Sequence, residues 1–276
     1  MTRLLGPSTI ALALALALGS ADIATAAPSS SAAATTSDAK PKAKAKTKAK
    51  AKTKAKRKRS RRPRVHSTVD AVTTPAYRYG ATSGPDCEAE LVKRGISFVS
   101  EPSPGVLAPV RLTAPLHGVT FRTNLSETAR AVTRWEIADC RLILALDDFA
   151  AILESHDIVE VRHYSMYRPP SKRWPDGKIA GQHAGALALD AAIFIDRDGN
   201  RIDVDDDWHG RIGAKTCGPD ARPRRGTPES LKLRELLCET AGKRLFNVIL
   251  TPNHNRGHKN HFHLEVTAGV RWFIVD

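Results

Sequence analysis

Three histidines lie close together near the end of the chain. His258, His261 and His263 are three of its ten histidines and fall within six residues. Apolar and polar side chains alternate around them, which predicts a strand over residues 261–266. Successive side chains of a strand point to opposite faces, so His261, His263 and Glu265 share one face. Two imidazoles then converge on one point, and this suits a metal with an adjacent proton-transfer group better than it suits a packed core.

A histidine and an aspartate seven residues apart form a second candidate group. His183 lies in a predicted loop, and Asp190 interrupts the apolar run of residues 186–195, which predicts a strand. A carboxylate in a buried strand is costly unless it is paired or bound to a metal. Alone, this pair fits a surface histidine and a salt-bridged aspartate equally well. Together with His263 it supplies two imidazoles and one carboxylate, which leave the fourth position of a catalytic zinc ion open for water.

These motifs resemble those of a group of zinc peptidases that includes D-alanyl-D-alanine carboxypeptidases, the penicillin-insensitive murein endopeptidase and the Hedgehog signalling domain. The group carries Ser-x-His-x-x-Gly-x-Ala-x-Asp and a later His-x-His or Glu-x-x-His. Within it, the chain is similar above all to the bacterial extensin-like C-terminal domain family, from about Cys87 to Val275. The likeness runs through the Cys-x-x-x-Leu start, Pro109–Leu112, the helix after Cys140, Tyr167-Arg168, Leu250–His254 and His258–His263.

The resemblance implies a zinc site and three further residues that act on the substrate. Zinc would be bound by His183, Asp190 and His263. His261 would act as the base or the transition-state stabiliser, His258 would line the site, and Arg168 would lie beside the substrate carbonyl or carboxylate. Amide hydrolysis supports these roles, because zinc lowers the pKa of bound water to about 7 and the developing oxyanion needs a nearby cation. A histidine with an unperturbed pKa near 6.5 is a suitable proton carrier.

The chain departs from the family pattern at three positions. Gly181 stands where the motif usually has Ser, so a hydroxyl that would orient a ligand is missing. Ala186 stands where many relatives have Gly, and Tyr167 where the extensin-like family has Cys, so the family's disulfide pattern cannot be copied. Gln182 and Glu265 are candidates for residues that orient the metal ligands.

The first 26 residues are typical of a secretory signal peptide. Arg3 precedes an apolar stretch over residues 9–18, and Ala24-Thr25-Ala26 forms a small-residue cleavage site. The apolar stretch is too short to span a bilayer. We therefore expect an exported protein that is periplasmic, associated with the cell envelope or secreted.

Residues 27–85 predict a disordered Lys/Ala-rich basic linker, because they carry few large apolar side chains. Residues 40–64, the Lys-rich arm, contain 15 Lys and Arg and no acid, whereas beyond residue 64 there are 27 basic and 27 acidic residues. The net charge of +14 thus comes from residues 1–64, almost entirely from the arm, and a nucleic-acid-binding domain is disfavoured. Anionic envelope polymers or anionic lipid are the expected partners of the arm, with a solvated spacer as the alternative.

Residues 86–276 are long enough for one domain with a core of its own. Four cysteines behind an export signal favour two disulfides, and of the three pairings we prefer Cys87 with Cys140 and Cys217 with Cys238. Periodicity predicts helices at 86–95, at 141–155 and from 227, and strands at 118–122, 158–167, 186–195, 201–204, 248–251, 261–266 and 270–275. The order indicates an α+β fold, a mostly antiparallel sheet flanked by helices. The acids at 196–207 indicate turns, because Gly199 is misplaced for a calcium loop.

The leading hypothesis is an exported zinc-dependent peptidase, either an endopeptidase or a carboxypeptidase, that cleaves peptidoglycan stem peptides or cross-links. The Lys-rich arm would tether it to the envelope. The alternative is a zinc-containing module that binds the cell wall without turnover, as the Hedgehog likeness permits. A monomer is expected, because the chain has no exposed heptad or repeat pattern.

Overall fold

A seven-stranded sheet is the centre of the computed structural model, which describes residues 70–276. Its order is β10-β8-β9-β6-β5-β3, and β7 pairs with β6 outside this path. The pairs of β6 with β5, β7 and β9, and of β8 with β9, are antiparallel, whereas β3 with β5 and β8 with β10 are parallel. The strands of this sheet are β3 (Thr120–Thr123), β5 (Ile158–His163), β6 (Ala188–Asp196), β7 (Arg201–Asp203), β8 (Val248–Leu250), β9 (Phe262–Glu265) and β10 (Ile274–Val275).

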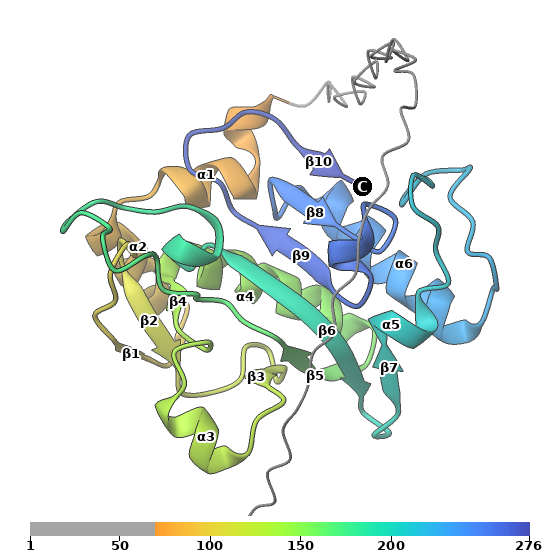
Figure 1. Cartoon of the computed structure of the whole chain (residues 1–276), viewed down its shortest axis with the longest axis horizontal. Helices are drawn as coiled ribbons and strands as arrows, with labels where there is room; N and C mark the ends of the chain where they lie inside the picture. The colour runs from red at the N-terminus through yellow and green to blue at the C-terminus, as the bar shows by residue number, and fades with distance from the viewer. Residues whose placement is uncertain (1–69) are drawn as a thin grey trace, which may run out of the picture. The chain divides into compact units, whose positions relative to one another are not determined.

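A small antiparallel sheet and several helices complete the fold (Figure 1). The small sheet has the order β1-β2-β4 and consists of β1 (Phe98–Ser100), β2 (Pro109–Leu112) and β4 (Ala138–Asp139). The helices are α1 (Pro75–Ala81), α2 (Gly84–Lys93), α3 (Glu127–Val132), α4 (Cys140–Ser155), α5 (Val204–Asp207) and α6 (Pro228–Gly242), with short 3-10 turns at Ala71–Thr73 (η1), Gln182–Gly185 (η2) and Arg256–His258 (η3). No helix among residues 70–276 is long and apolar enough to cross a membrane.

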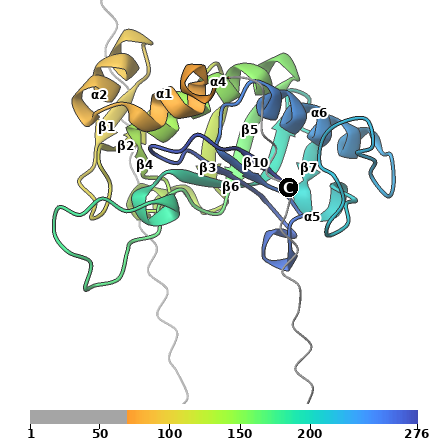
Figure 2. The same ribbon diagram turned by 90° about the horizontal axis from the view of Figure 1, so that it is seen from above.

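The two faces of the large sheet differ. Figure 2 shows α1, α2, α4 and α6 on one face, while the loop that follows β5 and the loop around η3 lie toward the other. Helix α4 begins where the Asp139 side chain accepts a hydrogen bond from the Arg141 amide at 3.0 Å. Its apolar spacing buries Leu142, Leu146 and Phe149 against the sheet. The helical face is therefore the hydrophobic core, and the opposite face is left for the site.

The α+β fold with a mostly antiparallel sheet and flanking helices agrees with the sequence prediction. The helices expected at 86–95, 141–155 and from 227 correspond to α2, α4 and α6 within two residues at each predicted end. The last strand is shorter than expected, because only Ile274 and Val275 pair with β8. The small sheet and α3 were not predicted as elements, since segments of two to six residues carry too little periodicity.

The linker predicted for residues 27–85 ends too late. Residues 75–81 form α1, where Ala76 and Tyr79 are buried. The Tyr79 hydroxyl donates a hydrogen bond to Asp148 on α4 and accepts one from Arg94 at 3.1 Å. Composition suggested disorder because this short helix has little apolar surface of its own, and α4 supplies the surface that buries it. The signal peptide, the Lys-rich arm and the rest of the linker up to residue 69 lie outside the described residues.

Both preferred disulfides are present. Cys87 on α2 joins Cys140 at the start of α4, and Cys217 joins Cys238 on α6. The first bond joins α2 to the start of α4, and the second holds the long loop after α5 against α6. The predicted turn chemistry is also found, since Asp196 Oδ1 accepts hydrogen bonds from two amides of the β6–β7 hairpin, at 2.8 and 3.1 Å.

The two disulfides are expected to contribute unequally to stability. Cross-links that close longer loops restrict the unfolded chain more, and the loops here span 53 and 21 residues. Replacing Cys87 and Cys140 together by Ala should lower the free energy of unfolding by about 4 kcal/mol, against about 3 kcal/mol for Cys217 and Cys238. Urea unfolding of the two double variants measures this, and a larger loss from the second pair would contradict the loop-length argument.

Candidate metal centre

Strand register brings the first two predicted ligands together. Asp190 on β6 lies directly opposite His263 on the antiparallel strand β9. Directly opposed residues point to the same face of a sheet. Phe262 and Leu264, which flank His263, are buried in the hydrophobic core. The predicted alternation of β9 is therefore observed, with the apolar residues toward the helices and His263 with Asp190 toward the other face.

The third predicted ligand comes from a strained turn. His183 lies in η2, between Gln182 at φ 51° and Ala186 at φ 53°, both in the left-handed region. Gly185 is required there, since a Cβ atom would come within 2.2 Å of the Ala180 carbonyl oxygen. The backbone carbonyl of His183 accepts a hydrogen bond from the Arg168 amide at 2.9 Å. The turn is thus tied to the segment after β5 and holds the imidazole over the sheet.

The donor atoms of these three residues form a compact triangle. Asp190 Oδ1 lies 3.0 Å from His183 Nε2 and 3.0 Å from His263 Nδ1, and the two nitrogens are 3.3 Å apart. Two ligands that are each about 2.0–2.1 Å from a tetrahedral zinc ion would be separated by about 3.3 Å. All three side chains are buried, and within residues 70–276 they form the only such group of His, Cys, Asp or Glu. The donor set and its spacing fit zinc.

Both imidazoles are held in the tautomer that a metal needs. His183 donates its Nδ1 proton to the Met166 carbonyl at 3.0 Å, which leaves Nε2 free for a metal. His263 donates its Nε2 proton to Glu265 at 3.1 Å, and the Thr267 hydroxyl donates to the other oxygen of that carboxylate at 2.8 Å. Glu265 therefore occupies the orienting position expected for it. Gln182 is exposed, and within the described residues its side chain makes no hydrogen bond to the cluster.

Charge is concentrated in this buried group. Burial alone would raise the pKa of Asp190, but hydrogen bonds from His183 and His263 hold it well below its usual range. Burial alone would lower the pKa of His263, but hydrogen bonds to Asp190 and Glu265 raise it to about 9. In the metal-free protein the extra proton on His263 therefore lies between its Nδ1 and Asp190, where a metal cation would bind.

A cleft of about 440 Å³ opens beside the cluster. The Arg168 guanidinium reaches into it and donates a hydrogen bond to Asp190 Oδ2 at 3.0 Å. His261 Nε2 lies 3.5 Å from Asp190 Oδ1, and its Nδ1 donates to the Asn260 side-chain carbonyl at 3.0 Å. Burial lowers the pKa of His261, so its ring is neutral near pH 7 and its Nε2 is free to accept a proton. His261, a base, and Arg168, a cation, therefore lie on the open side of the donor triangle.

The remaining predicted site residue, His258, lies next to the cluster. Its ring centre is 5.2 Å from that of His261 and 5.8 Å from that of His263. Its Nδ1 donates to the Asn255 side chain at 3.1 Å. Burial, together with repulsion from the two neighbouring imidazoles, lowers the pKa of His258 to about 4. The structure thus brings all six predicted residues together from four separate segments.

Sequence reasoning missed the aromatic walls of the cleft. Trp135 and Tyr164 line it and are each about half exposed. The Tyr164 hydroxyl accepts a hydrogen bond from Asn260 at 2.9 Å, and its ring meets that of His261 edge to face. Tyr164 could have been noticed from its position four residues before Arg168, whereas Trp135 comes from a segment without any chemical motif. Only the fold places it near the cluster.

Comparisons with known proteins give one match. A family model described as "Extensin-like protein C-terminus" matches residues 86–274, which include all six candidate residues and both disulfides. Neither the comparison with curated proteins nor the comparison with solved structures finds a match.

Glu265 is expected to tune zinc affinity without binding the ion. In Glu265→Gln the hydrogen bond that orients His263 is weakened, so zinc affinity should fall by about 10–100-fold. His183→Ala, which removes a ligand, should lose more. Competition with a fluorescent chelator measures both, and the exposed Gln182→Asn variant is the matched control. Unchanged affinity in Glu265→Gln would contradict the orienting role.

Zinc binding is expected to release a proton. His263 is mostly protonated below about pH 9 in the metal-free protein, and only its neutral form binds a metal. Near pH 7 about one proton should leave per ion, and apparent affinity should rise roughly tenfold per pH unit until about pH 9, where the release fades. Isothermal titration in buffers of different ionisation enthalpy measures the release, and an affinity that does not change between about pH 7 and 9 would contradict it.

Proposed function

The chain belongs to the extensin-like protein C-terminus family, and from its metal-ligand cluster we propose that it is an exported zinc-dependent peptidase that cleaves peptidoglycan stem peptides or cross-links. The observation that carries the proposal is the donor triangle of His183, Asp190 and His263, with His261 and Arg168 on its open side. A structural zinc site is closed by four protein ligands, whereas this group offers three. The fourth side faces a cleft, as hydrolysis requires.

The chain's own residues account for binding and proton transfer. Zinc, when bound, supplies a Lewis acid that activates water and polarises the substrate carbonyl. His261 takes the proton of the attacking water on Nε2 and returns it to the leaving amine. Asn260 holds the other ring nitrogen at 3.0 Å and so keeps that tautomer. Arg168, about half exposed in the cleft, holds the substrate carbonyl or carboxylate and offsets the charge that develops on oxygen.

The cleft and the N-terminal segments support a wall peptide as the substrate. Its volume of about 440 Å³ accommodates a few residues of a peptide, and exposed Trp135 and Tyr164 offer apolar surface to their aliphatic parts. The predicted signal peptide would direct the chain to the compartment where peptidoglycan lies. The Lys-rich arm would hold it at anionic envelope polymers by charge.

His261→Ala is expected to lose hydrolysis while it keeps zinc. Removing a general base typically slows a reaction by about 10²–10⁴-fold. The full chain, zinc-loaded or chelator-treated, is incubated with purified peptidoglycan, and released muropeptides are followed by mass spectrometry. His156→Ala, which changes a histidine paired with Glu239 outside the cluster, is the matched control.

The products also decide between the remaining alternatives. Release of a terminal residue identifies a carboxypeptidase, and release of cross-linked partners an endopeptidase. If the chain binds zinc and peptidoglycan but releases nothing from several wall types, it is a zinc-containing binding module, and the peptidase proposal is wrong. Release that persists in His261→Ala would remove this histidine from the mechanism.

A further inference from the structure

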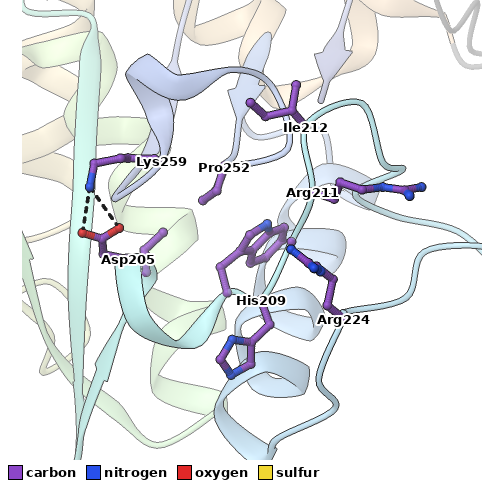
Figure 3. Close-up of a pocket in the computed structure, with 10 residues that line it drawn as sticks. Asp205, His209, Arg211, Ile212, Arg224, Pro252 and Lys259 are labelled. Atoms are coloured by element: carbon purple, nitrogen blue, oxygen red, sulfur yellow. Dashed lines mark hydrogen bonds and ion pairs between the residues drawn. The ribbon is translucent and has the colours of Figure 1, made fainter.

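A second cavity is lined in part by the loop that carries the histidines. It measures about 470 Å³ and opens between α5, the loop after it and the loop before β9. Figure 3 shows the pair of Lys259 and Asp205 on one side of this cavity and Arg211 with Arg224 on the other. The proposed peptidase mechanism uses none of these residues.

The cavity carries an excess of positive charge. Three of its lining residues, Arg211, Arg224 and Lys259, are cationic, and Asp205 is its one acid. Lys259 neutralises Asp205 at 3.3 Å. Within residues 70–276, no carboxylate lies within 4.0 Å of the Arg211 or Arg224 guanidinium. The Arg224 guanidinium, which Figure 3 shows turned toward the middle of the cavity, is therefore left to meet an anion, and Arg211 adds positive charge at the rim.

A buried arginine, Arg234, adds positive charge behind the Trp208 ring. Arg234 stacks on the Trp208 ring at 3.9 Å, and Trp208 lines the cavity. The Arg234 guanidinium donates to the Trp208 carbonyl at 2.7 Å, and its Nε has no partner. Burial lowers the pKa of Arg234 only to about 10, so it stays charged near neutral pH. An uncompensated buried cation is costly to the free protein, and an anion above Trp208 would offset part of that cost.

The cavity walls are preorganised. The buried Asn253 side chain accepts hydrogen bonds from Trp208 Nε1 at 3.1 Å and from the Arg211 amide at 2.9 Å. Gly210 has to be Gly, since a Cβ atom would come within 2.1 Å of that Asn253 oxygen. His209 takes a left-handed backbone at φ 47°, and its carbonyl accepts from the Arg224 amide at 2.7 Å. Backbone strain of this kind is kept where the surrounding structure requires a particular geometry.

The cavity borders the cleft of the metal centre. Lys259 lines one and His261 the other, and two residues span at most about 7 Å of chain. Lys259 pairs with Asp205 at 3.3 Å, and the next residue, Asn260, donates a hydrogen bond to the Tyr164 hydroxyl in the cleft at 2.9 Å. An extended peptide advances about 3.3 Å per residue, so a few residues reach from one site to the other.

We propose that this cavity is a carboxylate-binding subsite, which holds an acidic group of the peptide whose scissile bond lies in the cleft. The inference rests on the proposed peptidase function for the identity of the ligand. A guanidinium fork such as that of Arg224 suits a planar carboxylate, which accepts paired hydrogen bonds, and Arg211 at the rim adds attraction for the negative charge. Ile212, Pro252 and Trp208 give the aliphatic part of the peptide apolar walls. Wall stem peptides carry several free carboxylates and therefore fit both requirements.

Binding of a short acidic peptide to the chelator-treated full chain tests the subsite apart from hydrolysis. The probe is the tripeptide L-alanyl-γ-D-glutamyl-meso-diaminopimelate, measured by isothermal titration against the same peptide with its carboxylates converted to amides. The double variant Arg211→Gln, Arg224→Gln should bind the acidic tripeptide roughly tenfold more weakly or worse. Arg225→Gln, a neighbouring exposed arginine outside the cavity, should bind it as the unaltered chain does. Every variant contains the Lys-rich arm, so only the difference between them reports on the cavity.

The outcomes separate this inference from the proposed function. Equal affinity of the double and control variants, or of the acidic and amidated tripeptides, overturns the subsite even if the chain hydrolyses peptidoglycan. Preferential binding of inorganic phosphate over the tripeptide overturns it as well. If the variants differ as expected but no muropeptides are ever released, the subsite stands and the peptidase proposal falls. Thermal unfolding of the double variant verifies that its cavity loops still fold.

Discussion

The buried charge of Asp190 is the constraint on which the rest of the structure depends. A carboxylate removed from water without partners costs several kcal/mol, and β6 places this one in the middle of the sheet. Its two oxygens are met by His183, His263, His261 and Arg168, which come from three other segments. The loop after β5, the η2 turn and the segment at the start of β9 each bring at least one of these side chains to the carboxylate. Zinc would replace the shared protons with a stronger counter-charge.

One face of the sheet packs into the hydrophobic core, and the other face carries the candidate metal centre. Residues of α4 and the apolar positions of β9 pack into one hydrophobic core, which sets the register of β6 against β9. A shift of one residue would move His263 into that core and Phe262 to the site. The positions of the donor atoms are therefore secured by apolar packing on the opposite face. Glu265 and the Met166 carbonyl then set the orientation of the two rings.

The loop between β8 and β9 connects the two cavities. It carries Asn253, which supports the cationic cavity, and further along the histidines beside the cleft. A peptide that lies across this loop would meet guanidinium groups on one side and the donor triangle on the other. Such an arrangement would let binding energy from an acidic group far from the scissile bond orient that bond at the metal centre.

Much of this arrangement is present in the sequence as local pattern. Alternation around His261 and His263, an aspartate inside an apolar run and an even number of cysteines predicted the strands, the buried cluster and the disulfides, because strand period and buried-charge cost are local properties. The linker boundary was wrong, since the burial of Tyr79 depends on α4. Trp135 in the cleft, and Arg211, Arg224 and Arg234 around the second cavity, were missed. The sequence by itself determined which residues would form one buried cluster and that a sheet would carry them. Only the tertiary structure decided what surrounds that sheet, because cavity walls come from segments distant in the chain that carry no common periodicity.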